Sequence, residues 1–458
     1  MPELIKKLRA LVPHTNRSIM LAPIVGVVAG LGAIAFNLLC LVITHVSLEW
    51  LAGYHQGGPA NEAEYVDVFG HGLPHRDLVP WLLLIVPILG GLLSGWIVYK
   101  FAPEAEGHGT DAAIDAYHNK GGVVRGRVPL VKMVTSAITL GTGGSGGREG
   151  PIAQIGAGFG SYLATRLNLP DSDRRVLMTA GLGAGIGAIF HAPLAGAIFA
   201  AEVLYRDPDF EAEALIPAFI STTIAYCVFC LVFGFQPLFE VEAIGFNQPL
   251  LLMPLAVLAV VMVVMSWIYI KCFYGVSALF KRLRVPKMLK PAIGAGATGL
   301  FAVGLYYAIR SYADDKLAHE SLSVLSFGYG FLQNVLTNPT TMTAVVLLVV
   351  GLGKILTTSL TIGSGGSGGV FGPSMVIGGA LGAVVGLLFL KWTPGLVTEE
   401  QLPMFAILGM ASFFAATACT PVSTLIMVSE MTASYTLLLP SMWVCALAYL
   451  LNRRKTIY

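Results

Sequence analysis

Charge is what this sequence has least of. Only 12% of its 458 residues are Asp, Glu, Lys or Arg, whereas 55% are hydrophobic. Soluble domains carry roughly 25% charged residues, so a protein surrounded by water on all sides is excluded. The net charge of +2 is too small to indicate a nucleic-acid partner. We therefore expect a polytopic membrane protein whose main surroundings are lipid.

The sequence is also poor in patterns that build redox, metal or nucleotide sites. Its six cysteines lie in or beside apolar runs without histidine partners at metal spacing, so we expect reduced, buried thiols. Cys227 and Cys230 form a CxxC pair, but inside the apolar stretch "AYCVFCLVFG". The GxGxxG match at 363–368 lacks a surrounding βαβ pattern and predicts no nucleotide site. Because no nucleophile with a base is visible at membrane depth, we expect neither an enzyme nor a bound metal or cofactor.

Long apolar runs, by contrast, are abundant. The runs at 19–48, 79–101, 251–270 and 344–360 come near or exceed the roughly 18 to 20 residues needed to cross a bilayer. The N-terminus does not resemble a cleaved signal peptide, since scattered basic residues lead directly into the first run. Basic residues also cluster at 281–290 and 453–455. The positive-inside rule then predicts that both termini are cytoplasmic.

The sequence repeats itself across its two halves. "GGSGGREGP" at 143–151 returns as "GGSGGVFGP" at 365–373, with seven of nine positions identical. A second pair, "HAPLAGAIFAAE" and "TPVSTLIMVSE", places Glu202 and Glu430 each nine residues after a proline. Interrupted, glycine-rich helices in matching positions of two halves indicate a transporter whose site lies where the repeats meet. We predict a cytoplasmic segment at 1–18, membrane repeats at 19–235 and 251–458, and no soluble regulatory domain in this chain.

Each glycine run leads into an apolar helix with proline in its first turn. Proline starts a helix well, and the preceding glycines let the backbone N–H groups of 147–149 and 369–371 converge. Exposed N–H groups at the positive end of a helix dipole bind an anion without a buried cation. Glu149 can occupy that anion site as a gate that protonation releases, or it can simply stabilise its helix. Arg148 either attracts anions or extends to water.

A third glycine-rich turn lies in "PEAEGHGTDAAIDAYH". Gly107 and Gly109 flank His108, and Thr110 or Asp111 can cap the following helix. One interpretation directs the N–H groups of this turn toward the anion at the cytoplasmic mouth. The histidines and aspartates of this stretch could instead be metal ligands, or merely the solvated face of a helix. They are His108, Asp111, Asp115 and His118.

Taken in order, "GREGP", "HAPLAG", "GVFGP" and "SEMT" closely resemble the motifs of the CLC chloride channels and transporters. The resemblance covers essentially the whole membrane domain. It implies an all-α fold of two inverted-topology repeats with many tilted and broken helices. It also implies a homodimer with one anion pore per subunit and chloride as the bound substrate.

Individual roles follow from the same resemblance. Glu149 matches the gating glutamate of the family, and the backbone N–H groups of Val370 and Phe371 match those that bind the central chloride. Tyr458 is the candidate for the tyrosine whose hydroxyl contacts that anion. The resemblance thus implies anion-binding positions at His108, Gly109, Arg148, Gly150, Val370, Phe371 and Tyr458.

The chain departs from the family pattern at two places. Where the family has GSGIP, with a serine hydroxyl on the anion, this chain reads "GHGTD". His108 could therefore change anion preference or pH response, or turn aside and leave the anion to backbone N–H groups. The other departure is Val203, a non-protonatable residue at the position where proton exchangers of the family commonly carry an inner glutamate. Its neighbour Glu202 has Glu430 as its repeat counterpart, which favours a structural role over that of a substitute proton acceptor.

The missing inner glutamate decides the functional prediction. We expect a passive chloride channel of a prokaryotic inner (plasma) membrane, gated by Glu149. The alternative is a proton-coupled chloride antiporter that takes its inner proton through water or another residue.

Overall fold

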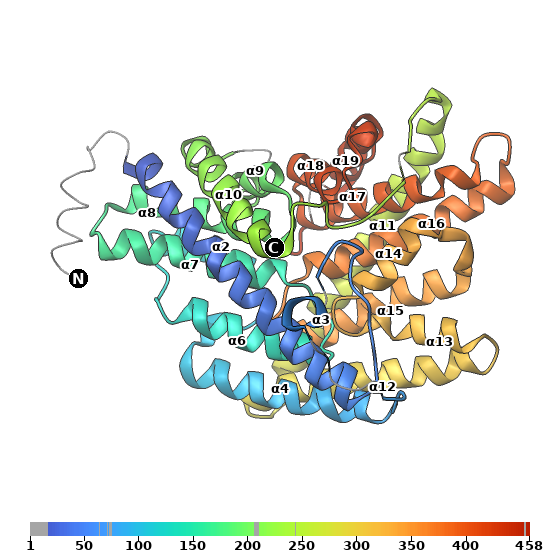
Figure 1. The fold of residues 1–458 in the computed structure, drawn as a ribbon, viewed down its shortest axis with the longest axis horizontal. Coiled ribbons are helices and arrows are strands. Elements are labelled where there is room, and N and C mark those ends of the chain that lie inside the picture. The colour runs from blue at the N-terminus through green and yellow to red at the C-terminus, as the bar shows by residue number, and fades with distance from the viewer. Residues whose placement is uncertain are drawn as a thin grey trace.

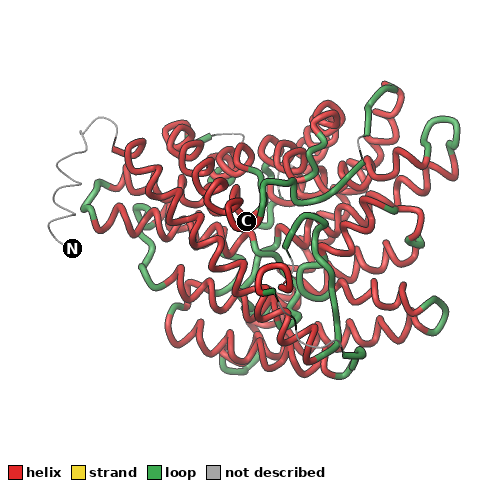
Figure 2. The backbone as a smooth tube through the Cα atoms, in the orientation of Figure 1, coloured by secondary structure: helices red, strands yellow, loops and turns green. Residues whose placement is uncertain are grey.

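The computed structural model describes residues 17–63, 65–70, 72, 76–205, 210–242, 244–452 and 455–458. Within these ranges the chain consists of helices and loops without a strand (Figure 2). Nine helices in this part of the chain are long and apolar enough to cross a membrane. The predicted segment 1–18 is described only from Arg17 onward. Arg453 and Arg454, from the predicted C-terminal basic cluster, lie outside the described residues.

The helices fall into two series of similar order. The first series comprises α2 (Arg17–Thr44), α3 (Tyr65–Phe69), α4 (Leu82–Phe101), α5 (Thr110–Asn119), α6 (Val128–Gly141), α7 (Glu149–Arg166), α8 (Asp171–Ile189), α9 (Pro193–Glu202) and α10 (Ala212–Phe233). The second comprises α11 (Leu252–Arg282), α12 (Lys290–Arg310), α13 (Asp315–Ser321), α14 (Tyr329–Thr337), α15 (Ala344–Gly363), α16 (Phe371–Trp392), α17 (Leu402–Ala418), α18 (Pro421–Met431) and α19 (Leu438–Asn452). In Figure 1 most of the first series lies on the left and most of the second on the right.

The four apolar runs coincide with four of the nine candidate spans among the described residues, and two of these four helices extend well beyond their runs. The helix that contains the apolar run 251–270 continues to Arg282, because basic side chains in a last turn complement the helix dipole and reach water. The helix predicted over 19–48 continues through a π-helical segment, His45–Leu51. The cysteine prediction also needs correction, since Cys227 is exposed on the surface of α10. An apolar surface faces lipid here, so hydrophobicity does not imply burial inside the protein.

Glycine allows equivalent helix pairs in the two halves to pack very closely. A Cβ atom on Gly156 of α7 would lie 2.1 Å from the carbonyl oxygen of Gly181 on α8. In the second half, a Cβ atom on Gly378 of α16 would lie 2.5 Å from the carbonyl oxygen of Gly409 on α17. Small residues at such contacts let helix backbones approach inside a membrane. The same packing of α7 on α8 and of α16 on α17 supports the two-repeat architecture.

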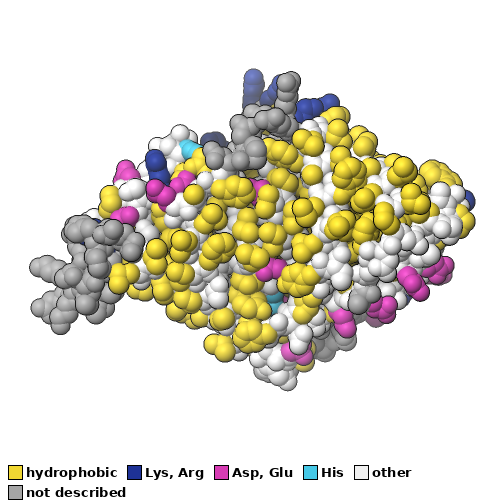
Figure 3. Space-filling view, turned by 90° about the horizontal axis from the view of Figure 1, so that it is seen from above, with side chains coloured by type: hydrophobic (Ala, Val, Ile, Leu, Met, Phe, Trp, Pro, Cys, Tyr) yellow, Lys and Arg dark blue, Asp and Glu magenta, His cyan; other side chains and the backbone are white. Residues whose placement is uncertain are grey.

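The surface agrees with a membrane environment. Hydrophobic side chains cover most of the face seen in Figure 3, and charged side chains lie mainly toward its margins. Exposed apolar residues on the spanning helices include Leu31 on α2, Leu231 on α10 and Leu450 on α19. The chain is therefore a multi-pass α-helical membrane protein, as predicted.

Candidate functional site

The two glycine runs of the repeats meet at the centre of the molecule. Gly147 and Gly369 exchange backbone hydrogen bonds, with N···O distances of 2.8 and 2.7 Å. Helices α7 and α16 both begin two residues after this crossing. A Cβ atom on Gly150 would lie 2.0 Å from the carbonyl oxygen of His108, so only glycine fits there. The repeats thus place two helix N-termini beside each other, as the sequence predicts.

Glu149 is the first residue of α7 and is almost completely buried, with 2% of its surface exposed. Its Oε1 atom accepts a hydrogen bond from the hydroxyl of Tyr329. Its Oε2 atom accepts one from the backbone N–H of Gly372, at 3.1 Å. The carboxylate therefore links the start of its own helix to donors on α14 and α16, both of which belong to the second repeat.

A small cavity adjoins this carboxylate. Four predicted site residues line it, namely Glu149, Gly150, Phe371 and Tyr458. Thr110 also lines it and supplies a hydroxyl that the sequence interpretation treated only as a helix cap. The remaining lining residues are the apolar Ile186, Phe190, Phe199 and Met427. With about 200 Å³ of empty volume, the cavity suits a small species rather than an organic ligand.

The side chain of His108 does not line this cavity. Its ring lies against Tyr458, with ring centroids 5.3 Å apart, and near Phe273, at 6.1 Å. Burial lowers the pKa of the His108 imidazole, against the opposing effect of the Asp111 carboxylate, whose Oδ1 lies 3.3 Å from Nδ1. The ring of this histidine packs behind Tyr458. Gly109, next in the chain, has a φ of 91° and turns the backbone into α5.

Val370 immediately precedes the first residue of α16 and is buried, with 1% of its surface exposed. Its position next to Phe371 is the one the resemblance implies for an anion-binding backbone group. The ring of Phe371 packs against Phe190 and Phe414, with centroids 4.6 and 4.2 Å away. These aromatic contacts fix the residue whose main chain starts α16.

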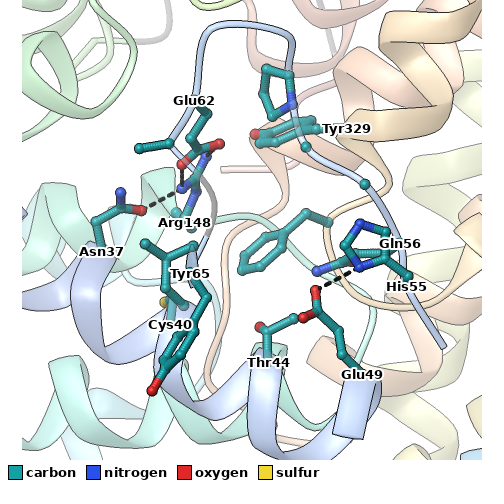
Figure 4. Close-up of a pocket in the computed structure, with 16 residues that line it drawn as sticks. Asn37, Cys40, Thr44, Glu49, His55, Gln56, Glu62, Tyr65, Arg148 and Tyr329 are labelled. Carbon is teal, nitrogen blue, oxygen red and sulfur yellow. Dashed lines mark hydrogen bonds and ion pairs between the residues drawn. The ribbon is translucent and has the colours of Figure 1, made fainter. Parts of the chain in front are cut away.

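Arg148 lies in a different cavity from Tyr458 (Figure 4). Its guanidinium donates two hydrogen bonds to the carboxylate of Glu62 and one to Asn37. It also lies over the ring of Tyr329, 5.6 Å from the centroid. Arg148 is thus neither free in water nor in contact with the cavity at Tyr458. Sequence reasoning missed Glu62, Asn37 and Tyr329, because no local motif marks them.

Two buried lysines reveal how the repeats hold the site. Lys132 donates to the carbonyl oxygen of Gly107 at 2.6 Å, and Lys354 donates to that of Ser326 at 2.9 Å. The lysines are 222 residues apart, the offset of the two glycine runs. Each fixes the loop before a short helix, α5 or α14. The first residues of these helices, Thr110 and Tyr329, lie at the cavity and on Glu149.

Glu202 and Glu430 form a reciprocal pair. Glu202, at the end of α9, accepts the backbone N–H of Ser423 in the first turn of α18, at 2.8 Å. Glu430, in the last turn of α18, accepts the backbone N–H of Ala195 in the first turn of α9, also at 2.8 Å. Each carboxylate thus satisfies unpaired donors at the start of the opposite helix. Val203, next to Glu202, is buried with 5% of its surface exposed.

Fold and site together define a multi-pass membrane protein whose two repeats oppose helix N-termini around a buried carboxylate. The family model described as voltage gated chloride channel matches residues 90–453. The chain therefore belongs to this family, the CLC family, as the sequence motifs predict.

Individual relatives are similar over nearly the whole chain. The H(+)/Cl(-) exchange transporter ClcA of Cronobacter sakazakii is 27% identical over 438 residues, which cover 94% of this chain and 86% of that protein. The structure of a slow cyanobacterial Cl⁻/H⁺ antiporter matches with a TM-score of 0.77 at 23% identity, covering 96% of this chain and 95% of the other. A CLC-type fluoride/proton antiporter also matches with a TM-score of 0.77, at 22% identity and 96% coverage of both chains. The two structural matches show the shared fold.

The prediction of a passive chloride channel is wrong. The similar proteins just described are an exchange transporter and two antiporters, and the alternative prediction fits them better. The channel prediction rested on a valine at one position, Val203. A single non-protonatable side chain does not close a proton route, because water and neighbouring groups also carry protons.

Proposed function

We propose that this protein exchanges chloride for protons across the membrane and that Glu149 is both its gate and its proton carrier. The observation that carries the proposal is the placement of the Glu149 carboxylate at the start of α7, on donors from Tyr329 and Gly372. Similarity to a named H(+)/Cl(-) exchange transporter supports it.

The surroundings of Glu149 provide a reason why proton movement and chloride movement would be coupled. Helix N-termini and hydrogen-bond donors stabilise one negative charge, which can be the ionised carboxylate or a chloride ion. When Glu149 takes a proton, it loses this stabilisation and leaves the donors to the anion. Because carboxylate and chloride compete for one place, protonation and anion occupancy alternate at Glu149.

The small cavity that Glu149 and Tyr458 line holds the anion. Besides Glu149, its lining includes two hydroxyl-bearing residues, Thr110 and Tyr458, together with Gly150 and Phe371 at the starts of α7 and α16. None of these groups carries a full positive charge, so the site can release a monovalent anion. His108 acts behind Tyr458 as a packing group rather than as a direct ligand.

The proton needs a second acceptor beyond this cavity. Glu202 is occupied in capping α18, and Val203 cannot accept a proton. Glu211, just before α10, accepts hydrogen bonds from the hydroxyls of Tyr117 and Tyr205. Tyr117 lies on α5, the helix that begins with Thr110 at the cavity. We assign the inner proton site to Glu211.

The orientation follows from the first span. The segment Arg17–Leu51 has 35 residues, about 50 Å of helix at roughly 1.5 Å per residue, so its ends lie on opposite sides of a bilayer. With the N-terminus cytoplasmic, as the positive-inside rule favours, the cavity at Arg148 faces outward. The same proposal includes three further points. The protein lies in the inner membrane, its repeats span 19–235 and 251–458, and it forms the homodimer that the family resemblance implies.

A flux experiment in proteoliposomes tests the exchange activity. The vesicles contain more chloride than the external buffer. The external pH is recorded, and valinomycin with potassium clamps the membrane potential. We expect chloride efflux to drive protons inward against a pH gradient. Chloride efflux without proton movement would refute the exchange function.

A further inference from the structure

A large groove lies on the outside of the first repeat. It has about 1240 Å³ of empty volume, and its walls come from α2, from the turn before α6 and from the last part of α7. These three helices pack on one another at the left of Figure 1. None of the residues that line the groove also lines the small cavity at Glu149. The groove is therefore separate from the proposed anion site.

Most of the groove is apolar and open to lipid. Its wall includes Val28 on α2, Leu130 on α6, and Phe159 and Leu163 on α7. Val28 and Leu130 are 39% and 59% exposed, on apolar helices whose outer surface faces the membrane. Water fits poorly there, because it needs several polar partners and these side chains supply none. The apolar part of the groove therefore suits a hydrocarbon chain.

The groove is closed at one end and polar at the other. At the closed end, a Cβ atom on Gly32 of α2 would lie 2.7 Å from the ring of Phe159 on α7, so the two helices meet there. At the polar end lie the groove arginines, Arg127 directly before α6 and Arg166 at the end of α7. A lipid chain that fills the groove thus has its head beside two guanidinium groups.

The polar end of the groove is level with the start of α2. Leu167, which follows Arg166, packs in one buried cluster with Leu21 near the start of α2. In the orientation proposed above this end of α2 is cytoplasmic, so the groove arginines lie at the depth of the inner-leaflet headgroups. Basic pockets between spanning helices on this side of a membrane bind anionic headgroups.

The groove arginines have no acidic partner among the residues that the structure describes. Neighbouring basic side chains do have one, since Arg125 pairs with Glu104, and Nζ of Lys120 lies 2.5 Å from Oδ2 of Asp115. Both groove arginines are exposed. Their positive charge is therefore available to an anion from outside the chain.

Tyr162 orients one of the groove arginines. Nε of Arg166 donates a hydrogen bond to the hydroxyl of Tyr162 at 2.8 Å, and its guanidinium lies 4.9 Å from the centroid of the tyrosine ring. Tyr162 itself lines the groove. A tyrosine has an apolar body and a polar tip, which suits the boundary between lipid chains and headgroups. This contact holds Arg166 at the groove and leaves its terminal nitrogens for a ligand.

We propose that the groove binds one anionic phospholipid, whose phosphate lies on Arg127 and Arg166 and whose acyl chain fills the apolar part. The apolar wall alone does not select a lipid, because lipid tails are as apolar as its side chains. Guanidinium groups match the oxygens of a phosphate, and a headgroup with net negative charge adds no opposing cation. Residues 1–16 of the chain fit this end less well, since they carry three basic residues and one acidic residue. The proposal does not depend on proton exchange.

The test compares two phospholipids with identical acyl chains, anionic phosphatidylglycerol and zwitterionic phosphatidylcholine. Native mass spectrometry of the purified protein in detergent counts the lipids retained per subunit at each lipid concentration. Each arginine should contribute about fivefold to the affinity for an anionic lipid, so the wild type should prefer phosphatidylglycerol by about 25-fold. Arg127→Gln together with Arg166→Gln should abolish this preference. Each single change should reduce it about fivefold, which keeps the test decisive if the double variant does not fold.

The matched control removes two positive charges from the same region of the protein. Lys120 and Arg125 are exposed, have acidic partners and do not line the groove. Lys120→Gln together with Arg125→Gln leaves the groove arginines in place, so the preference for phosphatidylglycerol should remain.

A second pair of variants tests the apolar part of the groove. Val28→Trp places a large ring in the groove and should weaken retention of phosphatidylglycerol. Leu31 is 55% exposed on the same helix and does not line the groove, so Leu31→Trp should leave retention unchanged.

Thermal unfolding provides a further readout. A ligand that binds only the folded state raises the unfolding temperature as its concentration rises. Phosphatidylglycerol should therefore stabilise the wild type and the Lys120 and Arg125 control more than phosphatidylcholine does. This difference should vanish when both groove arginines are replaced.

Two results would overturn the proposal. One is an equal affinity of the wild type for both lipids, or a loss of preference in the control as large as that in the groove variant. The other concerns glycerol 3-phosphate, which carries the charge of the headgroup without acyl chains and should not displace phosphatidylglycerol at equal concentration. If it binds as tightly as the lipid and needs the same arginines, the ligand is a soluble phosphate instead.

Discussion

The hydrogen bond from Tyr329 to Glu149 should set the pH at which the gate opens. Tyr329→Phe removes only the hydroxyl and leaves Glu149 with the backbone N–H of Gly372. A hydrogen bond to a charged group contributes roughly 1.5 to 3 kcal/mol, and one pH unit corresponds to about 1.4 kcal/mol. Because the lost bond stabilises the ionised carboxylate, the variant should protonate at higher pH. Water from the adjoining cavity replaces part of the bond, so we expect a shift of about one pH unit.

The assay is chloride flux into proteoliposomes as a function of external pH. Flux should rise as pH falls in both proteins, with the half-maximal pH of Tyr329→Phe about one unit higher than that of the wild type. Tyr306→Phe is the matched control, because Tyr306 is buried in α12 and packs beside His319 rather than at the gate. An unchanged or lower half-maximal pH in Tyr329→Phe would refute the assignment of Tyr329 as the residue that holds Glu149.

Three other predictions test the remaining roles. Glu149→Gln should give chloride flux that is independent of external pH and carries no protons; retained proton coupling in flux recordings would contradict its role. Glu211→Gln should lose proton coupling but keep chloride flux. The control is Glu213→Gln at a neighbouring exposed residue, which should keep both proton coupling and chloride flux. Coupled transport by Glu211→Gln would exclude Glu211 as the inner proton acceptor. Glu202→Gln and Glu430→Gln should each lower the free energy of unfolding by about 1 to 3 kcal/mol, as measured by thermal unfolding. Neither change should alter the ratio of protons to chloride in flux recordings. A changed ratio would show that the substituted glutamate carries protons.

The sequence was sufficient for the architecture because repetition is visible in one chain. The apolar runs named above located four of the nine candidate spans among the described residues, and the two glycine runs predicted that the repeats meet where Gly147 and Gly369 pair. Helix ends were harder to predict, since water, lipid and the helix dipole decide where an apolar run stops. For this reason α11 ends at Arg282, well beyond the apolar run at 251–270.

Site residues that belong to a sequence motif could be predicted. Residues that only the fold brings to the site, from distant parts of the chain, could not. The motif residues Glu149, Gly150, Phe371 and Tyr458 line one cavity. Glu62 reaches Arg148 from a loop far away in the sequence, and no spacing rule connects such a pair.

At His108 and Val203 the motif position was recognised, but the residue type led to a wrong or untested functional expectation. Each occupies a motif position, and a functional consequence was drawn from its residue type alone. The ring of His108 packs beside Tyr458 outside the cavity, so its chemistry does not reach the anion directly. At Val203 the missing carboxylate suggested a channel, although a proton route depends on every group and water along it.

The reversal potential of the current through a bilayer containing the purified protein tests the central claim most directly. Chloride is kept equal on both sides while a pH gradient is imposed. The account predicts that the reversal potential moves away from zero in proportion to the pH gradient, because proton movement is tied to chloride movement. A reversal potential that stays at zero at every pH gradient would contradict coupled exchange.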